Sequence, residues 1–172
     1  MALLNDHNTI SLPNEALAEG LFRLSFKAMG TACEISFSAE SSTQAEDFRN
    51  KSLSWVKNFE KRYSRYLPDS LISQINRNAG TNKLVSLNEE DIRLFKLCDT
   101  LHFFTKGLFD PTALPLSLLW DFKTKNPQIP DQQKIDYALT KINWNKVIIK
   151  DQLVSLPEVG MGIDFGGFGK EF

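Results

Sequence analysis

Apolar and polar side chains alternate over two short stretches between Leu21 and Ala39. Such alternation is typical of strands that bury one face. The two stretches are separated by Met29-Gly30-Thr31, where glycine permits a tight turn. We therefore expect two strands joined at this turn, preceded by an N-terminal tail over residues 1–20.

A different periodicity begins at Thr43, where apolar residues recur at spacings of three, four and seven up to Tyr66. This spacing predicts an amphipathic helix with one apolar stripe, stopped by Pro68. Asn88 with Asp91 is typical of a helix N-cap with an acidic third position. Further helices are expected over residues 69–80, 88–107, 111–120 and 131–141.

The remaining strands are predicted to be short. One lies near Leu84-Val85, a hairpin joins residues 147–149 to 153–156 around Asp151-Gln152, and a last strand from Val159 runs into glycines. Helices and strands are intermixed without strict alternation. The fold class expected is therefore α+β, with a mixed, largely antiparallel sheet and packed helices.

Composition excludes several classes of protein. The 172 residues are 42% hydrophobic and 24% charged with a net charge of −1, which suits one globular domain and gives no reason to expect nucleic acid as a partner. No apolar run has the length of a signal peptide or of a ~20-residue membrane span. Cys33 and Cys98 are expected to be buried apolar residues, although a pairing in an oxidising compartment stays open. His7 and His102 are assigned no chemistry.

The densest local signal is the glycine-rich segment from Gly160 to Lys170. It does not match the dinucleotide fingerprint, which needs glycine where Phe165 stands, nor a Walker A loop, which needs glycine at Asp164 and Ser or Thr at Glu171. Its backbone amides, with Lys170 as a point charge, would suit a pyrophosphate. A tight turn without a ligand explains the same residues.

Four segments taken together are more specific. They are Ala28-Met29-Gly30-Thr31; Tyr63 to Ser70 with Ile72-Ser73 and Asn76; Gly107 to Thr112 with Pro115-Leu116 and Leu119-Trp120; and Ile163 to Gly167 with Lys170. In this order, from about Ser25 to the last residue, the chain resembles the ApbE-type flavin transferases, the FAD:protein FMN transferases.

The resemblance implies an enzyme that moves the FMN half of FAD onto a Ser or Thr hydroxyl of a flavin-acceptor protein, with magnesium (Mg2+) and release of AMP. Carried over by motif position, the cofactor-binding residues are Met29, Tyr66, Leu108, Phe109, Asp110, Asp164 and Lys170. The backbone carbonyl of Gly167 would bind the metal. No catalytic residue is assigned.

These roles suit the residue types, because a tyrosine ring can stack on an isoalloxazine and a thioether can fill its irregular edge. Each residue also has a plainer interpretation. Tyr66 and Met29 could be packing residues, Asp110 could cap the turn before Pro111, and Asp164 could close a turn.

Members of the family continue for about as long again after the glycine loop, and that part carries a histidine and metal-binding side chains. We therefore expect residues 21–172 to be the N-terminal portion of a flavin-transferase-like domain, truncated relative to the full fold, with exposed edges that favour self-association. The alternatives are a truncated, non-catalytic FAD-binding module and a structural partner domain. The resemblance implies a periplasmic or inner-membrane-associated protein, and the absence of a visible signal peptide leaves the cytoplasm as the alternative.

Overall fold

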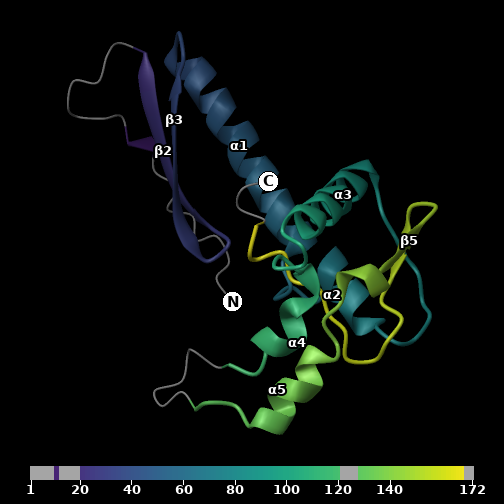
Figure 1. Cartoon of the computed structure of the whole chain (residues 1–172). Coiled ribbons are helices and arrows are strands. Elements are labelled where there is room, and N and C mark those ends of the chain that lie inside the picture. The colour runs from purple at the N-terminus through teal and green to yellow at the C-terminus, as the bar shows by residue number, and fades with distance from the viewer. Residues whose placement is uncertain (1–9, 12–19, 121–127, 169–172) are drawn as a thin grey trace. The chain divides into compact units, whose positions relative to one another are not determined.

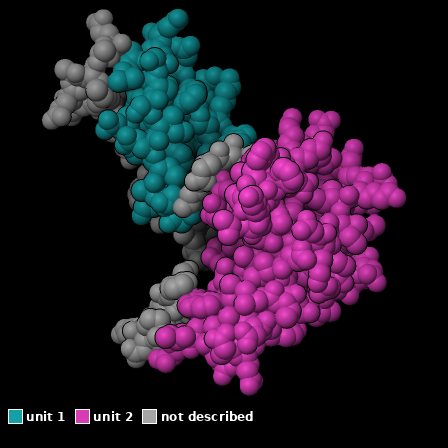
Figure 2. Space-filling model, viewed as in Figure 1, with its two compact units in different colours: residues 1–62 teal, residues 63–172 magenta. Residues whose placement is uncertain are grey.

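The computed structural model describes residues 10–11, 20–120 and 128–168 (Figure 1). The chain divides into two compact units, residues 1–62 and residues 63–172 (Figure 2). None of the helices in the described ranges is long and apolar enough to cross a membrane.

The first unit contains a three-stranded antiparallel sheet in the order β1-β2-β3, followed by a helix. Its elements are β1 (Ile10–Ser11), β2 (Leu21–Ala28), β3 (Thr31–Ser38) and α1 (Ser42–Tyr63). Met29 and Gly30 both have positive φ, of 51° and 74°, and form the turn between β2 and β3. The predicted hairpin is confirmed, and β1 adds a strand from within the predicted N-terminal tail.

The core of this unit lies on one face of the hairpin. Leu24, Phe26 and Ala28 alternate along β2 and are buried. Half-buried residues pack against them, namely Met29, Cys33, Ile35, Phe37, Leu53 and Val56. Because Leu53 and Val56 belong to α1, this helix covers the apolar face of the hairpin and lies alongside it (Figure 1).

The second unit combines helices with another three-stranded antiparallel sheet, in the order β4-β6-β5. Its elements are α2 (Leu71–Arg77), β4 (Val85–Ser86), α3 (Glu89–Phe104), the 3-10 helix η1 (Pro111–Ala113), α4 (Leu114–Ser117), α5 (Gln132–Leu139), the 3-10 helix η2 (Trp144–Lys146), β5 (Ile148–Lys150) and β6 (Leu153–Ser155). The α+β class and the predicted hairpin around Asp151-Gln152 are confirmed.

The start of α3 agrees with the sequence in detail. The Asn88 side chain accepts a hydrogen bond from the Asp91 backbone N–H, and the Asp91 carboxylate accepts one from the Asn88 N–H. Asp91 is fully buried, and its second oxygen accepts a 2.7 Å hydrogen bond from the Tyr63 hydroxyl. The predicted cap therefore also joins α3 to the last residue of α1.

One predicted helix end and one predicted strand are wrong. The long helix ends at Tyr63 rather than Tyr66, because the Ser64 hydroxyl accepts the Tyr66 N–H that a helical carbonyl would otherwise bind. No strand follows Val159 within the described residues; this segment forms turns and irregular backbone. Gly160 has φ of +88°. The backbone after it is hydrogen-bonded to the Asn76 side chain and to the Pro111 carbonyl rather than to a neighbouring strand.

Candidate functional site

The glycine loop, residues 160–168, is held in the second unit by an asparagine far away in the sequence. The Asn76 side chain on α2 donates to the Ile163 carbonyl at 2.9 Å and accepts from the Ile163 N–H at 2.7 Å. One amide side chain thus satisfies both backbone groups of a fully buried residue, as a strand neighbour would. The Asp164 N–H donates to the Pro111 carbonyl at 2.9 Å, which brings the loop against η1.

Aromatic rings fasten the same loop to the core of its unit. Phe165 is buried and packs edge-on against Phe95 of α3, with ring centroids 5.5 Å apart. Phe168 packs edge-on against Phe109 at 5.2 Å and against Phe165 at the same distance. Apolar side chains therefore anchor the loop, while Gly166 and Gly167 remain exposed.

Asp164 projects from this loop into a group of polar contacts. One carboxylate oxygen accepts the Gly166 N–H at 2.9 Å, and the other lies 2.7 Å from Nε of Arg65. Nη2 of Arg65 donates to the Tyr66 hydroxyl at 2.7 Å, and the guanidinium carbon lies 4.2 Å from the centre of the Tyr66 ring. Tyr66 is 67% exposed, so an aromatic surface remains accessible beside Asp164.

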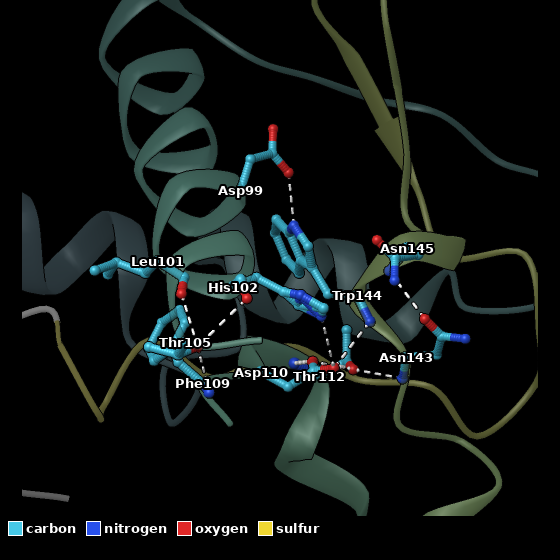
Figure 3. A network of polar contacts seen from close by, with 10 residues as sticks. All are labelled: Asp99, Leu101, His102, Thr105, Phe109, Asp110, Thr112, Asn143, Trp144 and Asn145. Carbon is cyan, nitrogen blue, oxygen red and sulfur yellow. Dashed lines mark hydrogen bonds and ion pairs between the residues drawn. The ribbon is translucent and has the colours of Figure 1, made fainter. Parts of the chain in front are cut away.

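Asp110 is the centre of a second polar network (Figure 3). Its Oδ1 accepts hydrogen bonds from the Thr112 N–H at 2.8 Å and from the Thr112 hydroxyl, and its Oδ2 accepts from the Trp144 N–H at 3.0 Å. Thr112 in turn accepts from the Asn143 N–H at 2.9 Å. The capping role of Asp110 is confirmed, and its contact with a nucleotide stays a prediction.

His102, to which sequence analysis assigns no chemistry, also lies beside this network. Its Nε2 lies 3.9 Å from Oδ2 of Asp110, and both side chains are largely buried. The contact becomes an ion pair only when the imidazole is protonated. The Trp144 indole N–H donates a 2.6 Å hydrogen bond to Asp99 (Figure 3). This bond fixes Trp144, whose backbone N–H donates to Asp110.

Leu108 and Phe109 lie on the turn that leads into Asp110. Leu108 is 93% exposed, whereas Phe109 is half-buried and its N–H donates to the Thr105 hydroxyl at 3.0 Å. The preceding Gly107 has φ of +82°, a conformation that favours glycine. The turn therefore exposes the Leu108 side chain, while the Phe109 ring packs against Phe168.

The remaining predicted site residues are placed differently. Met29 belongs to the first unit, where it is half-buried and its N–H donates to the Glu60 carboxylate at 3.3 Å. Lys170 lies outside the described residues. Gly167 is exposed, and a methyl group added to it would meet no atom within 4 Å. The second unit thus brings Tyr66, the residues 108–110 and Asp164 onto adjoining segments.

The described residues do not by themselves fit a magnesium site. No group of three or more His, Cys, Asp or Glu side chains gathers anywhere in the described ranges. Magnesium binds through oxygen ligands, commonly one or two carboxylates with substrate phosphates and water. Each oxygen of Asp164 already has one donor, and the Gly167 carbonyl stays the metal ligand that the family resemblance predicts.

The two cysteines and the surface carboxylate Glu158 are further ionisable groups of the chain. Cys33 and Cys98 are both free thiols, and burial raises the pKa of the Cys98 thiol. Glu158 accepts a 2.7 Å hydrogen bond from Lys146, which lowers the pKa of its carboxyl.

Arg65 and Asn76 are the positions that sequence reasoning undervalued. Both stand inside the segments that carry the family resemblance, but neither received a role. For Asn76 the available signal is an amide side chain directly after a buried apolar residue, Ile75. Arg65 has no such signal, since its neighbours Ser64 and Tyr66 are not buried.

Comparison with known proteins agrees with this arrangement. The model of the ApbE family matches residues 29–172. Two curated proteins described as FAD:protein FMN transferase, from Chlamydia muridarum and Chlamydia pneumoniae, are 31% identical over 83 residues and 30% identical over 82 residues. Each match covers 48% of this chain and 26% of the relative.

Solved structures give the same answer for the fold. The ApbE protein of Thermotoga maritima is 27% identical with a TM-score of 0.77, over 87% of this chain and 48% of that one. The flavin transferase ApbE of Vibrio cholerae has a TM-score of 0.77 at 18% identity, over 88% of this chain and 51% of that one. The chain therefore spans about half the length of these solved relatives.

Proposed function

This chain belongs to the ApbE family, and from that premise we propose that it binds FAD and transfers its FMN moiety to a Ser or Thr hydroxyl of an acceptor protein. The names of the curated relatives support this function, since both are described as FAD:protein FMN transferases. The arrangement of the second unit supplies the physical argument.

The observation that carries the proposal is the meeting of three sequence segments around Asp164. Residues 63–66, 108–112 and 163–168 come from separate parts of the chain, and specific contacts join them: Arg65 with Asp164, Pro111 with Asp164, and Phe109 with Phe168. At their surface lie an exposed tyrosine ring, an exposed leucine and a glycine pair. This set offers a stacking surface together with the exposed backbone of Gly167.

The proposed division of roles follows from these groups. The Tyr66 ring stacks on the isoalloxazine, and Leu108 contacts the ligand through its exposed side chain. The exposed backbone N–H of Gly167 is the loop donor that we assign to the pyrophosphate. The N–H groups of Asp164 and Gly166 already donate to the Pro111 carbonyl and the Asp164 carboxylate. Asp164, bound to Arg65 and Gly166, keeps the loop in that conformation.

In the transfer itself, the acceptor hydroxyl oxygen forms a bond to the phosphorus of the FMN phosphate. The bond from that phosphorus to the bridging oxygen breaks, and AMP leaves with the bridging oxygen. The hydroxyl proton passes to a base, and no described residue is assigned this role. The chain's contribution is therefore to bind and orient FAD.

Magnesium is part of the proposal through the family resemblance alone. A divalent cation would neutralise charge on the pyrophosphate during transfer. Because the described residues gather no cluster of ligating side chains, we assign none of them to the ion beyond the Gly167 carbonyl. Titration of magnesium into the FAD-binding assay, with EDTA as the reverse test, measures whether the ion changes affinity.

FAD binding is the first test, measured by calorimetry and flavin fluorescence on the whole chain. Tyr66→Ala should weaken binding by about 1–3 kcal/mol through lost stacking, by analogy with nucleic-acid bases on aromatic rings. Tyr137→Ala is the matched control, because Tyr137 is 63% exposed in the same unit and lies beside Lys141 rather than Asp164. Equal affinities for the two variants would overturn the assignment of Tyr66.

Transfer is tested separately, by incubation with FAD, magnesium and a candidate acceptor, followed by AMP release and covalent flavin fluorescence on the acceptor. Transfer confirms the enzyme. FAD binding without transfer would make this chain a non-catalytic FAD-binding module. If a folded chain gained no thermal stability from FAD, where tight binding predicts about 2.7 kcal/mol at 100 times the Kd, the flavin site itself would be refuted.

Two further parts of the proposal concern the cell and the assembly. By family resemblance we propose a periplasmic or inner-membrane-associated location, which fractionation of the native host tests directly. We also propose that the chain self-associates through exposed apolar surface, such as Phe103 and Phe104 at the end of α3. Sedimentation over a range of concentrations should then show a mass above 19.5 kDa.

A further inference from the structure

We propose that Arg65 is a positioning residue that fixes the Tyr66 ring for stacking on the flavin, with Asp164 as its anchor. The inference rests on the proposed function, since it assumes a flat ligand at Tyr66. It concerns a side chain that touches the ring from one side and the glycine loop from the other.

The first step is the anchor. Nε of Arg65 lies 2.7 Å from Oδ2 of Asp164, and only 21% and 27% of these side chains are exposed. A pair so shielded is less screened by salt than a surface ion pair. Asp164 is itself held by the Gly166 N–H, and the Arg65 carbonyl accepts a hydrogen bond from the Ser73 hydroxyl at 3.2 Å. Arg65 is therefore bound at its backbone and at its guanidinium.

The second step is the link to the ring. Nη2 of Arg65 donates to the Tyr66 hydroxyl at 2.7 Å while its guanidinium carbon lies 4.2 Å from the ring centre. The planar guanidinium makes the contacts with Asp164 and Tyr66 at once through different nitrogens. A lysine ammonium is a compact charge on a flexible stem and does not reproduce this fork.

The third step asks why the ring is held at all. Tyr66 is 67% exposed, so its position contributes little to burial of apolar surface. An exposed tyrosine fixed by a hydrogen bond and a cation–π contact has lost rotational freedom before any ligand arrives. Binding of a flat ligand then costs less side-chain entropy, because the Tyr66 ring is already ordered.

The test is a double-mutant cycle read by FAD affinity. Arg65→Lys should weaken FAD binding roughly tenfold, the size of one lost hydrogen bond. In a Tyr66→Ala background the same change should have almost no further effect, because Arg65→Lys keeps a positive charge for Asp164 and removes only the link to the ring. Arg77→Lys is the control, since Arg77 is an exposed arginine of the same unit that donates to the Pro68 carbonyl.

Two readouts separate positioning from a purely structural role. Quenching of flavin fluorescence by the bound protein should fall in Arg65→Lys even at saturating FAD, because the ring is no longer held parallel to the flavin. Tyr66→Phe, which keeps the ring and leaves Arg65 and Asp164 in place, should show a partial loss of both affinity and quenching. This variant tests the link even if Arg65→Lys fails to fold.

The outcomes are distinguishable. If the unaltered chain binds no FAD, the proposed function fails. If it binds FAD but Arg65→Lys weakens binding equally in the Tyr66 and Tyr66→Ala backgrounds, the function stands and the positioning role is refuted. Unchanged affinity and quenching in Tyr66→Phe would refute it as well.

Discussion

Different kinds of interaction stabilise the interior of each of the two units. In the first, one apolar face of a hairpin packs against α1, and the residues involved are neighbours in a regular strand pattern. In the second, the glycine loop is bound by Asn76, Pro111 and Arg65, which lie on separate segments. Every predicted ligand-binding residue except Met29 and Lys170 lies among the described residues of the second unit.

The difference shows how a scaffold and a site are encoded. A periodic apolar pattern needs only the right residue types at the right spacing, so it tolerates exchange among similar side chains. A polar clasp such as Asn76 with Ile163 needs one particular side chain, because both a donor and an acceptor are required. Substitutions should therefore reveal the two kinds of interaction.

The largest effect is expected in the apolar core of the first unit. Leu24 is fully buried between strands and α1, so Leu24→Ala should lower the free energy of unfolding by about 2–5 kcal/mol through lost transfer energy and a cavity. Chemical denaturation measures this change. Leu84→Ala, at an exposed leucine, is the control and should stay within about 0.5 kcal/mol. Similar losses for both would show that the hairpin core is not stabilising.

The next effect tests a close backbone approach in the second unit. Gly80 has φ of +74°, its N–H donates to the Leu156 carbonyl at 2.9 Å, and an added Cβ would lie 2.3 Å from Cγ2 and 2.6 Å from the backbone N of Val159. Gly80→Ala should therefore cost about 2–4 kcal/mol of unfolding free energy. Gly167→Ala, where the added methyl meets nothing within 4 Å, should be nearly neutral in the same assay.

The polar clasp should give a smaller loss of stability but a sharper local effect. Asn76→Ala leaves the Ile163 N–H and carbonyl without their partner, which costs about 1–3 kcal/mol. Hydrogen exchange should then rise over residues 159–168 more than elsewhere. Asn76→Asp keeps the acceptor and removes the donor, so it should be intermediate, and Asn145→Ala at an exposed asparagine should leave exchange unchanged.

The smallest effect concerns pH. The hydrogen bond from Lys146 lowers the pKa of Glu158 below that of the unfolded chain. A carboxyl with a lowered pKa stabilises the fold above the unfolded pKa and loses this contribution as pH falls through the folded pKa. Glu158→Gln should therefore lower Tm slightly near neutral pH and not in acid. A Tm difference that stayed constant across this range would contradict the ion-pair explanation.

Local signals account for most of the predicted elements. The turn at Met29-Gly30, the cap formed by Asn88 and Asp91, and the hairpin around Asp151-Gln152 were all expected from nearby residues and are all present. Their physical cause is confined to a few positions, so a single sequence reveals it. The end of the long helix was missed because one hydroxyl, that of Ser64, competes with the helical hydrogen bond.

The site was predictable only in part, for a related reason. Family resemblance indicated Tyr66, Leu108 and Asp164. No sequence pattern predicts that Arg65 contacts both Tyr66 and Asp164, or that Asn76 binds the Ile163 backbone. Contacts between residues far apart in sequence depend on how the elements pack. The wrong strand after Val159 has this origin, since the backbone there pairs with a side chain instead of a strand.

The clasp between Asn76 and Ile163 also bears on the order of folding. It closes a span of 87 residues, and such long loops cost entropy before their contacts repay it. The hairpin of the first unit, whose strands are joined by a two-residue turn, has no such barrier. On a ribosome the hairpin can form while Ile163 is still unsynthesised, so the surface around Asp164 is completed late. Partly made chains would therefore hold a folded hairpin well before the contacts around Asp164 exist.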